Sequence, residues 1–168
     1  GIVGASLIGR RVIELLGPFP HLRVALYDPF VSEAEAATLG VTKMELDELC
    51  ATVDILSSHA PDLPSTRHMI GAPQLAALRT GATVINTARG ALLDHDALLA
   101  EVSIGRLSAV LDVTSPEPLP DDHPLRFGIR IRRAALDRYL GRLDDARHEF
   151  AAADAGLAKI FPEDHPDR

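Results

Sequence analysis

The chain has 168 residues, of which 46% are hydrophobic and 24% are charged, and its formal net charge is −7. This composition is typical of a globular protein, and the length predicts one ordinary domain with a smaller appendage. The acidity lies wholly in residues 1–126, which hold 9 basic and 16 acidic residues, whereas residues 127–168 hold 8 of each. An acidic domain argues against binding to nucleic acid.

Several other classes are excluded by what the sequence contains. Cys50 is the single cysteine, which rules out a disulfide framework and a thiolate metal cluster and suits a reducing cytoplasm, the compartment we predict. No run of 18 apolar residues predicts a membrane span. No two of the seven histidines have metal-ligand spacing on an expected helix, so no metal site is predicted. The sequence starts with Gly1 inside an expected strand, which predicts a preceding segment.

The first nine residues, Gly-Ile-Val-Gly-Ala-Ser-Leu-Ile-Gly, predict the end of a buried strand and a tight glycine turn. An amphipathic run over residues 10–16 predicts the helix that follows. A helix N-terminus at such a turn binds the pyrophosphate of a dinucleotide. Ser6 stands where the Gly-x-Gly-x-x-Gly pattern has its second glycine, and it can either crowd the pyrophosphate or donate a hydrogen bond to it. The candidate residues of this turn are Gly4, Ser6, Leu7, Ile8 and Gly9.

A second strand, residues 22–28, ends in the carboxylate of Asp28. At this distance from a glycine turn, an acid can accept both ribose hydroxyls of NAD and repel the 2′-phosphate of NADP. The alternative is that Asp28 is a turn residue before Pro29.

Further helices and strands then alternate along the chain. We expect helices from Ser32 as N-cap to Gly40, over 45–50, over 73–79 and over 94–104 with Gly105 at the C′ position, and strands over 53–59, 82–87 and 107–113. This alternation predicts an α/β fold with a doubly wound parallel sheet of the Rossmann type. Ligands of such sheets bind at the carboxyl ends of the strands. The residues expected there are Ser6, Asp28, His59, residues 86–90 and residues 112–117.

Residues 1 to about 125 resemble the NAD-binding domain of the D-isomer-specific 2-hydroxyacid dehydrogenases. The matching stretches are the glycine turn, Tyr27-Asp28-Pro29, His59-Ala60-Pro61, residues 85–90 (Ile-Asn-Thr-Ala-Arg-Gly), and residues 111–118, which run from Leu-Asp-Val to Glu-Pro. The resemblance implies hydride transfer between NAD and a small D-2-hydroxy or 2-oxo acid. It also implies a domain of residues 1–126 whose sheet is incomplete at both ends, and it allows a homodimer.

The resemblance assigns roles to single residues. Arg89 binds the substrate carboxylate, as a planar guanidinium can do through two parallel hydrogen bonds, and Glu117 supports a proton-transferring histidine. Taken singly, Arg89 and Glu117 can also be solvated loop residues and Asp112 a strand-end cap. The implied cofactor-binding residues beyond the turn are Asp28, His59, Ala60, Pro61, Thr66, Thr87, Ala88, Arg89 and Asp112.

The family's catalytic histidine belongs to a Pro-His motif at the end of a sixth strand, and that motif is not found after Glu117. His123 follows in a loop, so we assign the general acid to no residue and expect this chain to be inactive by itself. The alternatives are a non-catalytic NAD-binding or protein-interaction module, and the product of a decayed or fused gene.

Residues 127–168 have a different character, rich in arginine and alanine and helical in pattern. They predict an α-helical hairpin that breaks at residues 141–143. Residues 127–160 resemble one tetratricopeptide repeat, with small residues at Ala134, Ala146 and Ala153 and with Phe150 following Ala146. Because a single repeat cannot bury both its faces, the hairpin is expected to pack on the sheet, bind a protein partner or stay loose. The alternative is a surface hairpin of no family.

Overall fold

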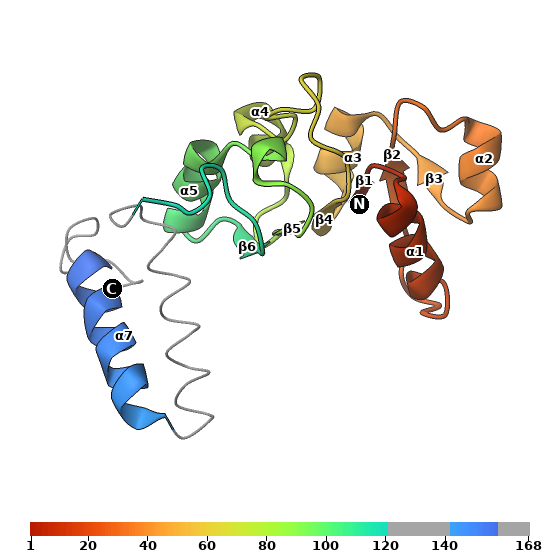
Figure 1. The fold of residues 1–168 in the computed structure, drawn as a ribbon. Coiled ribbons are helices and arrows are strands. Elements are labelled where there is room, and N and C mark those ends of the chain that lie inside the picture. Colours follow the sequence, from red (N-terminus) through yellow and green to blue (C-terminus); the bar gives the residue numbers. More distant parts are fainter. Residues whose placement is uncertain (121–141, 158–168) are drawn as a thin grey trace. The chain divides into compact units, whose positions relative to one another are not determined.

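The computed structural model describes residues 1–120 and 142–157. The chain divides into two compact units, Gly1–Glu117 and Pro118–Arg168, which we describe separately. The first unit is a sheet flanked by helices (Figure 1). Its strands are β1 (Ile2–Val3), β2 (Ala25–Tyr27), β3 (Thr42–Lys43), β4 (Ile55–Ser58), β5 (Thr83–Asn86) and β6 (Ser108–Leu111). Its helices are α1 (Leu7–Leu16), α2 (Glu33–Thr38), α3 (Leu46–Thr52), α4 (Ala72–Ala77), the 3₁₀ turn η1 (Gly90–Leu92) and α5 (His95–Ser103).

The six strands lie in the order β3-β2-β1-β4-β5-β6, and every neighbouring pair is parallel. The chain builds outward from β1 to β3, returns, and builds outward again from β4 to β6. The strand order therefore reverses between β1 and β4. In open parallel sheets a ligand binds outside the carboxyl ends of the strands at this reversal. The predicted doubly wound, Rossmann-type fold is confirmed.

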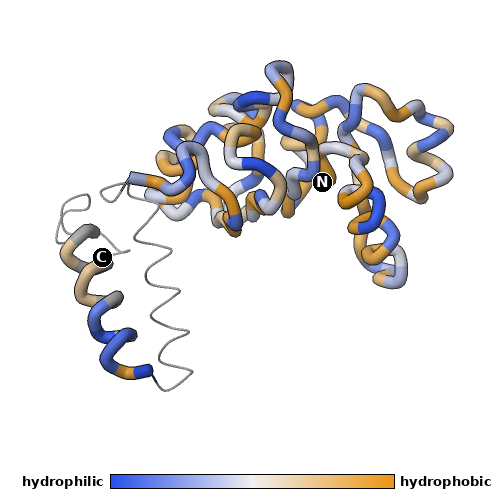
Figure 2. Tube along the Cα trace, in the orientation of Figure 1, coloured by the Kyte–Doolittle hydropathy of each residue, from blue (hydrophilic) through white to orange (hydrophobic). Residues whose placement is uncertain are grey.

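Two clusters of apolar side chains form the core, one on each face of the sheet. On one face, Val3, Leu56 and Val84 of the sheet pack with Leu49 of α3 and other side chains of α3, α4 and α5. On the other face, Ile2 and Leu26 pack with residues of α1 and α2, such as Ile13 and Ala36. Apolar residues recur along the whole trace of this unit (Figure 2). Burial of both faces explains why these strands read as nearly continuous apolar runs.

Three features of the sheet unit differ from the sequence-based expectation. Strand β3 was not predicted because it has two residues, neither of them apolar, and it exists through its pairing with β2. Helix α1 begins at Leu7, before the amphipathic run, because Ser6 caps it. The 3₁₀ turn η1 was not predicted either. The predicted cap Ser32 is confirmed, since its side chain accepts the N–H of Glu35. Asp94, predicted as the first residue of its helix, is the N-cap of α5 and accepts the N–H of Ala97.

Cys50 lies in α3 with its side chain fully buried. Burial, followed by the charge of Asp47, raises the pKa of its thiol to about 11. Because the thiolate is the reactive form, we expect a thiol-specific reagent to label the native chain at least about 100-fold more slowly than the unfolded chain. Absorbance of the released chromophore at pH 8, with and without urea, measures both rates. Rapid stoichiometric labelling of the folded chain would contradict this expectation.

The second unit contains helix α7 (Leu143–Leu157), in which Ala146 is buried. The rest of the predicted hairpin, including Ala134 and the break at Gly141, lies outside the described residues, as do His123 and the predicted domain boundary at Arg126. The tetratricopeptide resemblance and the boundary therefore stay predictions. Within residues 1–120 and 142–157, no helix is long and apolar enough to cross a membrane.

Candidate cofactor-binding site

The glycine turn lies at the strand-order reversal and packs tightly on the end of β4. Gly4 has a φ of +94°, and its N–H donates to the carbonyl of Tyr27 at 2.8 Å. A Cβ on Gly4 would lie 2.7 Å from the backbone of Ala60, and one on Gly9 would overlap the Gly4 carbonyl. Contact therefore requires glycine at both positions, and at Gly4 the left-handed conformation requires it as well. This packing brings the turn and the His59-Ala60 segment together, as predicted.

Ser6 is the N-cap of α1. Its φ of −62° suits any residue, and its Oγ accepts the N–H of Gly9 at 3.2 Å. The first helical hydrogen bond runs from the N–H of Arg10 to the carbonyl of Ser6 at 2.9 Å. Leu7 and Ile8 are 90% and 67% exposed, and their N–H groups have no acceptor among the described residues. Two open N–H groups at the positive end of a ten-residue helix favour an anionic ligand.

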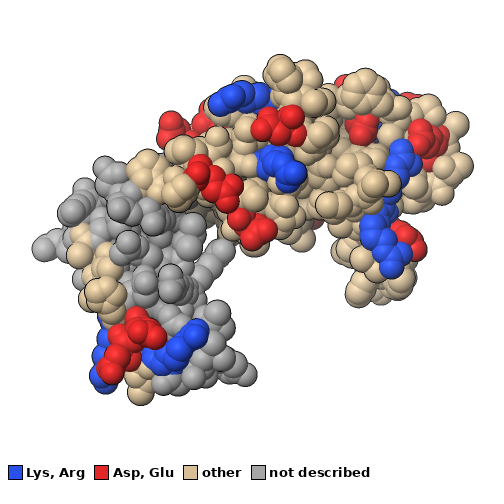
Figure 3. All heavy atoms as spheres, in the orientation of Figure 1, with Lys and Arg blue, Asp and Glu red and all other residues tan. Residues whose placement is uncertain are grey.

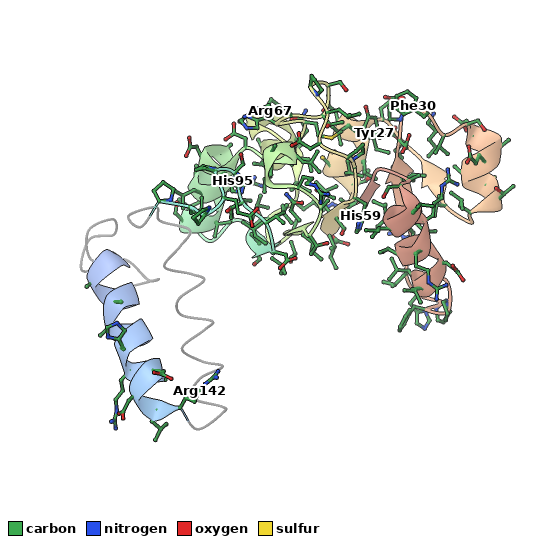
Figure 4. The ribbon with its side chains drawn as sticks, viewed as in Figure 1. Tyr27, Phe30, His59, Arg67, His95 and Arg142 are labelled. Carbon is green, nitrogen blue, oxygen red and sulfur yellow. The ribbon has the colours of Figure 1, made fainter. Side chains whose placement is uncertain are left out.

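Asp28 follows β2 and joins the glycine turn to the next loop. One carboxylate oxygen accepts the N–H of Ala5 at 2.7 Å, and the other accepts the N–H of Phe30 at 2.8 Å. A carboxylate oxygen can accept two hydrogen bonds, so each retains a lone pair for a ligand hydroxyl. Phe30 is almost fully exposed beside it, at the outer side of the loop (Figure 4). Asp28 thus combines the predicted turn role with free acceptor capacity.

Hydrogen bonds and buried contacts fix the segment after β4. His59 is 8% exposed, and its Nε2 lies 2.9 Å from Oγ of Ser57. Ala60 is buried against Gly4, and Pro61 is exposed. The Thr66 hydroxyl donates to the Pro61 carbonyl at 2.7 Å and accepts the N–H of Leu63 at 2.9 Å. These contacts give Thr66 a loop-closing role, whereas its predicted cofactor role stays a prediction.

Burial lowers the pKa of His59 below its ordinary value of 6.5. The folded chain holds His59 neutral while the unfolded chain takes up the proton, so its contribution to stability is complete above pH 6.5 and is lost as the pH falls through the lowered folded pKa. We expect the free energy of unfolding to fall more steeply below pH 6.5 in the native chain than in His59→Gln. Urea unfolding from pH 7.5 to 5 measures both slopes. His21→Gln, which replaces an exposed histidine, is the matched control, and equal slopes for all three chains would contradict the expectation.

Asn86 organises the loop that follows β5. The sequence pattern placed it at the end of a strand but did not predict this role. It is fully buried, donates from Nδ2 to the Arg89 carbonyl at 2.9 Å, and accepts the Ala88 N–H at 3.1 Å. An asparagine at the end of an apolar strand is a sequence signal for such a turn. The loop leaves Thr87 and Arg89 exposed, and the Arg89 guanidinium donates to the Ala88 carbonyl at 2.7 Å.

The loops after β5 and β6 touch through Gly90. A Cβ on this buried glycine would overlap the backbone of Thr114, so only glycine permits the approach. The Asp112 N–H also donates to the Asn86 carbonyl at 3.0 Å. The structure therefore places Arg89 and Asp112 on adjoining loops. Asp112 and Glu117 are exposed, and within the described residues no hydrogen bond or ion pair joins Glu117 to Arg89.

Basic and acidic side chains are interspersed over the visible face of the sheet unit (Figure 3). At the carboxyl edge itself, Arg10 comes from α1, Asp28 from the end of β2, and Arg89 and Asp112 from the loops after β5 and β6. No group of three or more histidine, cysteine, aspartate or glutamate side chains within residues 1–120 and 142–157 is arranged to hold a metal ion. The chemistry available at this edge is anion binding by N–H groups and guanidinium groups, and hydroxyl binding by Asp28.

Comparison with known proteins identifies the family. Residues 1–141 match the family model described as "D-isomer specific 2-hydroxyacid dehydrogenase, NAD binding domain". D-3-phosphoglycerate dehydrogenase of Methanocaldococcus jannaschii is 36% identical over 127 residues, 74% of this chain and 24% of that protein. The enzyme of the same name from Mycobacterium tuberculosis is 40% identical over 122 residues, 72% of this chain and 23% of that protein. The chain thus spans about a quarter of the length of these curated relatives.

Solved structures agree in fold. Apo D-mandelate dehydrogenase of Rhodotorula graminis has a TM-score of 0.66 and 32% identity, over 71% of this chain and 36% of that one. The NAD-complexed D-isomer specific 2-hydroxyacid dehydrogenase of Lactobacillus delbrueckii has a TM-score of 0.63 and 33% identity, over 70% and 35%. The chain belongs to the NAD-binding domain family of the D-isomer specific 2-hydroxyacid dehydrogenases, which are oxidoreductases, and its cofactor is NAD.

Proposed function

We propose that NAD binds at the carboxyl edge of the sheet between β1 and β4. The open N–H groups of Leu7 and Ile8, with Gly4, Ser6 and Gly9 shaping the turn, hold the pyrophosphate. Asp28 accepts the hydroxyls of the adenosine ribose. The observation that carries this proposal is the 2.7 Å hydrogen bond from the Ala5 N–H to Asp28, because it joins the phosphate-binding turn to the ribose acid.

The remaining predicted contacts follow the same edge toward the nicotinamide. We place His59, Ala60, Pro61 and Thr66 along one side of the cofactor. Thr87, Ala88, Arg89 and Asp112 lie along the side formed by the loops after β5 and β6. The contact through Gly90 supports this grouping, because it holds the two loops together.

The reaction we assign to the protein is hydride transfer between NAD and a D-2-hydroxy or 2-oxo acid. NAD, when bound, accepts or supplies the hydride. The Arg89 guanidinium is exposed and can bind the substrate carboxylate through paired hydrogen bonds in place of its bond to Ala88. Glu117 orients the group that exchanges a proton with the substrate oxygen. No described residue is assigned that proton, so we propose that residues 1–168 bind the cofactor without turnover.

Calorimetric titration with NAD and with NADP tests the cofactor site. We expect saturable NAD binding, much weaker NADP binding, and an Asp28→Ala variant with about 10-fold lower NAD affinity, because the ribose then loses a charged acceptor. Asp54→Asn is the matched control, since Asp54 is an exposed acid at the opposite, amino-terminal end of β4. Equal NAD affinity for the native chain and Asp28→Ala would refute the assigned ribose contact.

A second function is a non-catalytic NAD-binding module whose helical unit contacts a protein partner. The observation that favours it is that His59, the histidine at the site, is buried and bonded to Ser57 and so cannot serve a substrate. Steady-state assays with NADH and a panel of 2-oxo acids separate the two functions. Turnover would exclude the module, whereas NAD binding without turnover, together with NAD-dependent capture of a partner, would support it. Size-exclusion chromatography would test the homodimer that the family resemblance allows.

A further inference from the structure

The backbone of one residue separates the proposed ribose acid from a guanidinium. The N–H of Ala5 donates to Asp28 at 2.7 Å, and the carbonyl of Ala5 accepts Nε of Arg10 at 2.9 Å. Ala5 itself is buried. The glycine turn is thus held from both sides, by an anion at its N–H and by a cation at its carbonyl.

The Arg10 guanidinium is also held by a second acid. Its Nη2 lies 2.7 Å from Oε1 of Glu35, and the two side chains are 37% and 41% exposed. Glu35 stands in the first turn of α2, where its N–H donates to the Ser32 Oγ at 3.2 Å. The acid is therefore fixed by a capped helix, and both charged groups still reach solvent at the edge where the cofactor is proposed to bind.

A guanidinium close to the adenosine ribose has a clear chemical consequence. Arginine binds phosphate through paired hydrogen bonds and stays charged at any working pH. An unengaged Arg10 would therefore attract the 2′-phosphate that distinguishes NADP from NAD. Its pairing with Glu35 engages Nη2 of this guanidinium and offsets part of its charge.

We propose that Glu35 is a specificity-determining residue, which favours NAD by keeping the Arg10 guanidinium engaged and away from a 2′-phosphate. Cofactor choice then depends on two carboxylates: Asp28 repels the phosphate, and Glu35 occupies the cation that could receive it. This inference rests on the proposed binding of the ribose by Asp28.

A mutant cycle on the full chain tests the proposal, with NAD and NADP affinities measured by calorimetry. Glu35→Gln is expected to tighten NADP binding about threefold and to change NAD affinity less than twofold, the size typical of a partly exposed charge pair. Asp28→Asn is expected to weaken NAD binding about 10-fold. The double variant is expected to bind NADP at least about threefold more tightly than the product of the single effects predicts, because Arg10 is then free and the repulsion is gone.

Arg10→Met in the double-variant background is expected to remove the gain in NADP affinity, and salt of about 0.5 M is expected to reduce it strongly. Glu14→Gln is the matched control, because Glu14 forms an exposed ion pair with Arg11 at 2.6 Å on the same helix. Thermal unfolding of each variant checks the fold, and Asp28→Ser replaces Asp28→Asn if the latter unfolds.

Two results would overturn the inference. One is an NADP affinity of the double variant that equals the product of the two single effects. The other is a gain in NADP affinity that survives Arg10→Met. Both require that the native chain binds NAD. Absence of NAD binding to the native chain would instead refute the proposed function itself, so the two failures are distinguishable.

Discussion

Replacing Gly4 by alanine is expected to lower the free energy of unfolding by about 3 kcal/mol or more. A φ of +94° costs a residue with a side chain about 1–2 kcal/mol, and forcing a methyl group into a packed site costs about 1–3 kcal/mol more. At Gly4 the methyl group would lie 2.7 Å from the backbone of Ala60, which cannot move without displacing the end of β4. Urea unfolding followed by circular dichroism measures the loss.

Gly81→Ala separates the two contributions. Gly81 has a similar φ of +86°, but a Cβ there would meet nothing within 4 Å. It should cost only the conformational part, about 1–2 kcal/mol. Equal losses for the two variants would show that the turn yields to the added methyl group, and the tight contact between the turn and Ala60 would then be excluded as a source of stability.

Arg106→Met is expected to lower the free energy of unfolding by about 3 kcal/mol, since it removes three hydrogen bonds from a charged donor at a site that is about four-fifths buried. Nη1 and Nη2 of Arg106 donate to the carbonyls of Leu78 and Leu75, each at 2.6 Å. Nε lies 2.5 Å from Oε2 of Glu101, and the two side chains are 21% and 19% exposed. The hydrogen bond from Arg106 lowers the pKa of Glu101. The arginine therefore ties the end of α4 to α5. Its loss removes the side-chain donors of the Leu78 carbonyl and the Glu101 carboxylate, and it leaves the Leu75 carbonyl with only the N–H of Leu78.

Arg79→Met is the matched control for charge. Arg79 lies 3.4 Å from Asp54 in a pair whose side chains are 57% and 83% exposed, so its loss should cost less than about 0.5 kcal/mol. The comparison uses the same unfolding measurement for both variants. A similar small loss for Arg106→Met would mean that water replaces the three bonds at no cost, which would contradict the burial of this site.

Local patterns in the sequence were sufficient for most of the fold. Apolar runs bounded by glycine or proline predicted five of the six strands, and Ser32 and Asp94 predicted the starts of their helices. Gly105, with a φ of +68°, follows the C-cap of α5 as expected. Strand β3 could not be predicted, because its two residues form a strand through hydrogen bonds to β2 and not through any preference of their own. The 3₁₀ turn η1 likewise depends on the contact at Gly90.

For the candidate site, the sequence predicted which segments meet but not which partners their side chains bind. The turn, Asp28 and the His59-Ala60 segment were expected at one edge, and the structure brings them together. The ion pair of Arg10 with Glu35 joins residues 25 positions apart, on two helices whose relative placement no local pattern encodes. The hydrogen bond from the Thr66 hydroxyl to the Pro61 carbonyl was not predicted either, because it depends on the exact path of residues 61–66.

The hydrogen bonds of the Ala5 backbone have consequences for the entropy and the rate of ligand association. Its N–H and carbonyl are both satisfied by side chains, and the Gly9 N–H is satisfied by Ser6. The turn is therefore already shaped before a ligand arrives, and the entropy of ordering it is lost during folding and not during association. A dinucleotide arriving at this turn displaces water and breaks none of these protein hydrogen bonds. Association should accordingly follow a single fast exponential whose rate rises linearly with ligand concentration, without the plateau that a slow reshaping of the turn would impose.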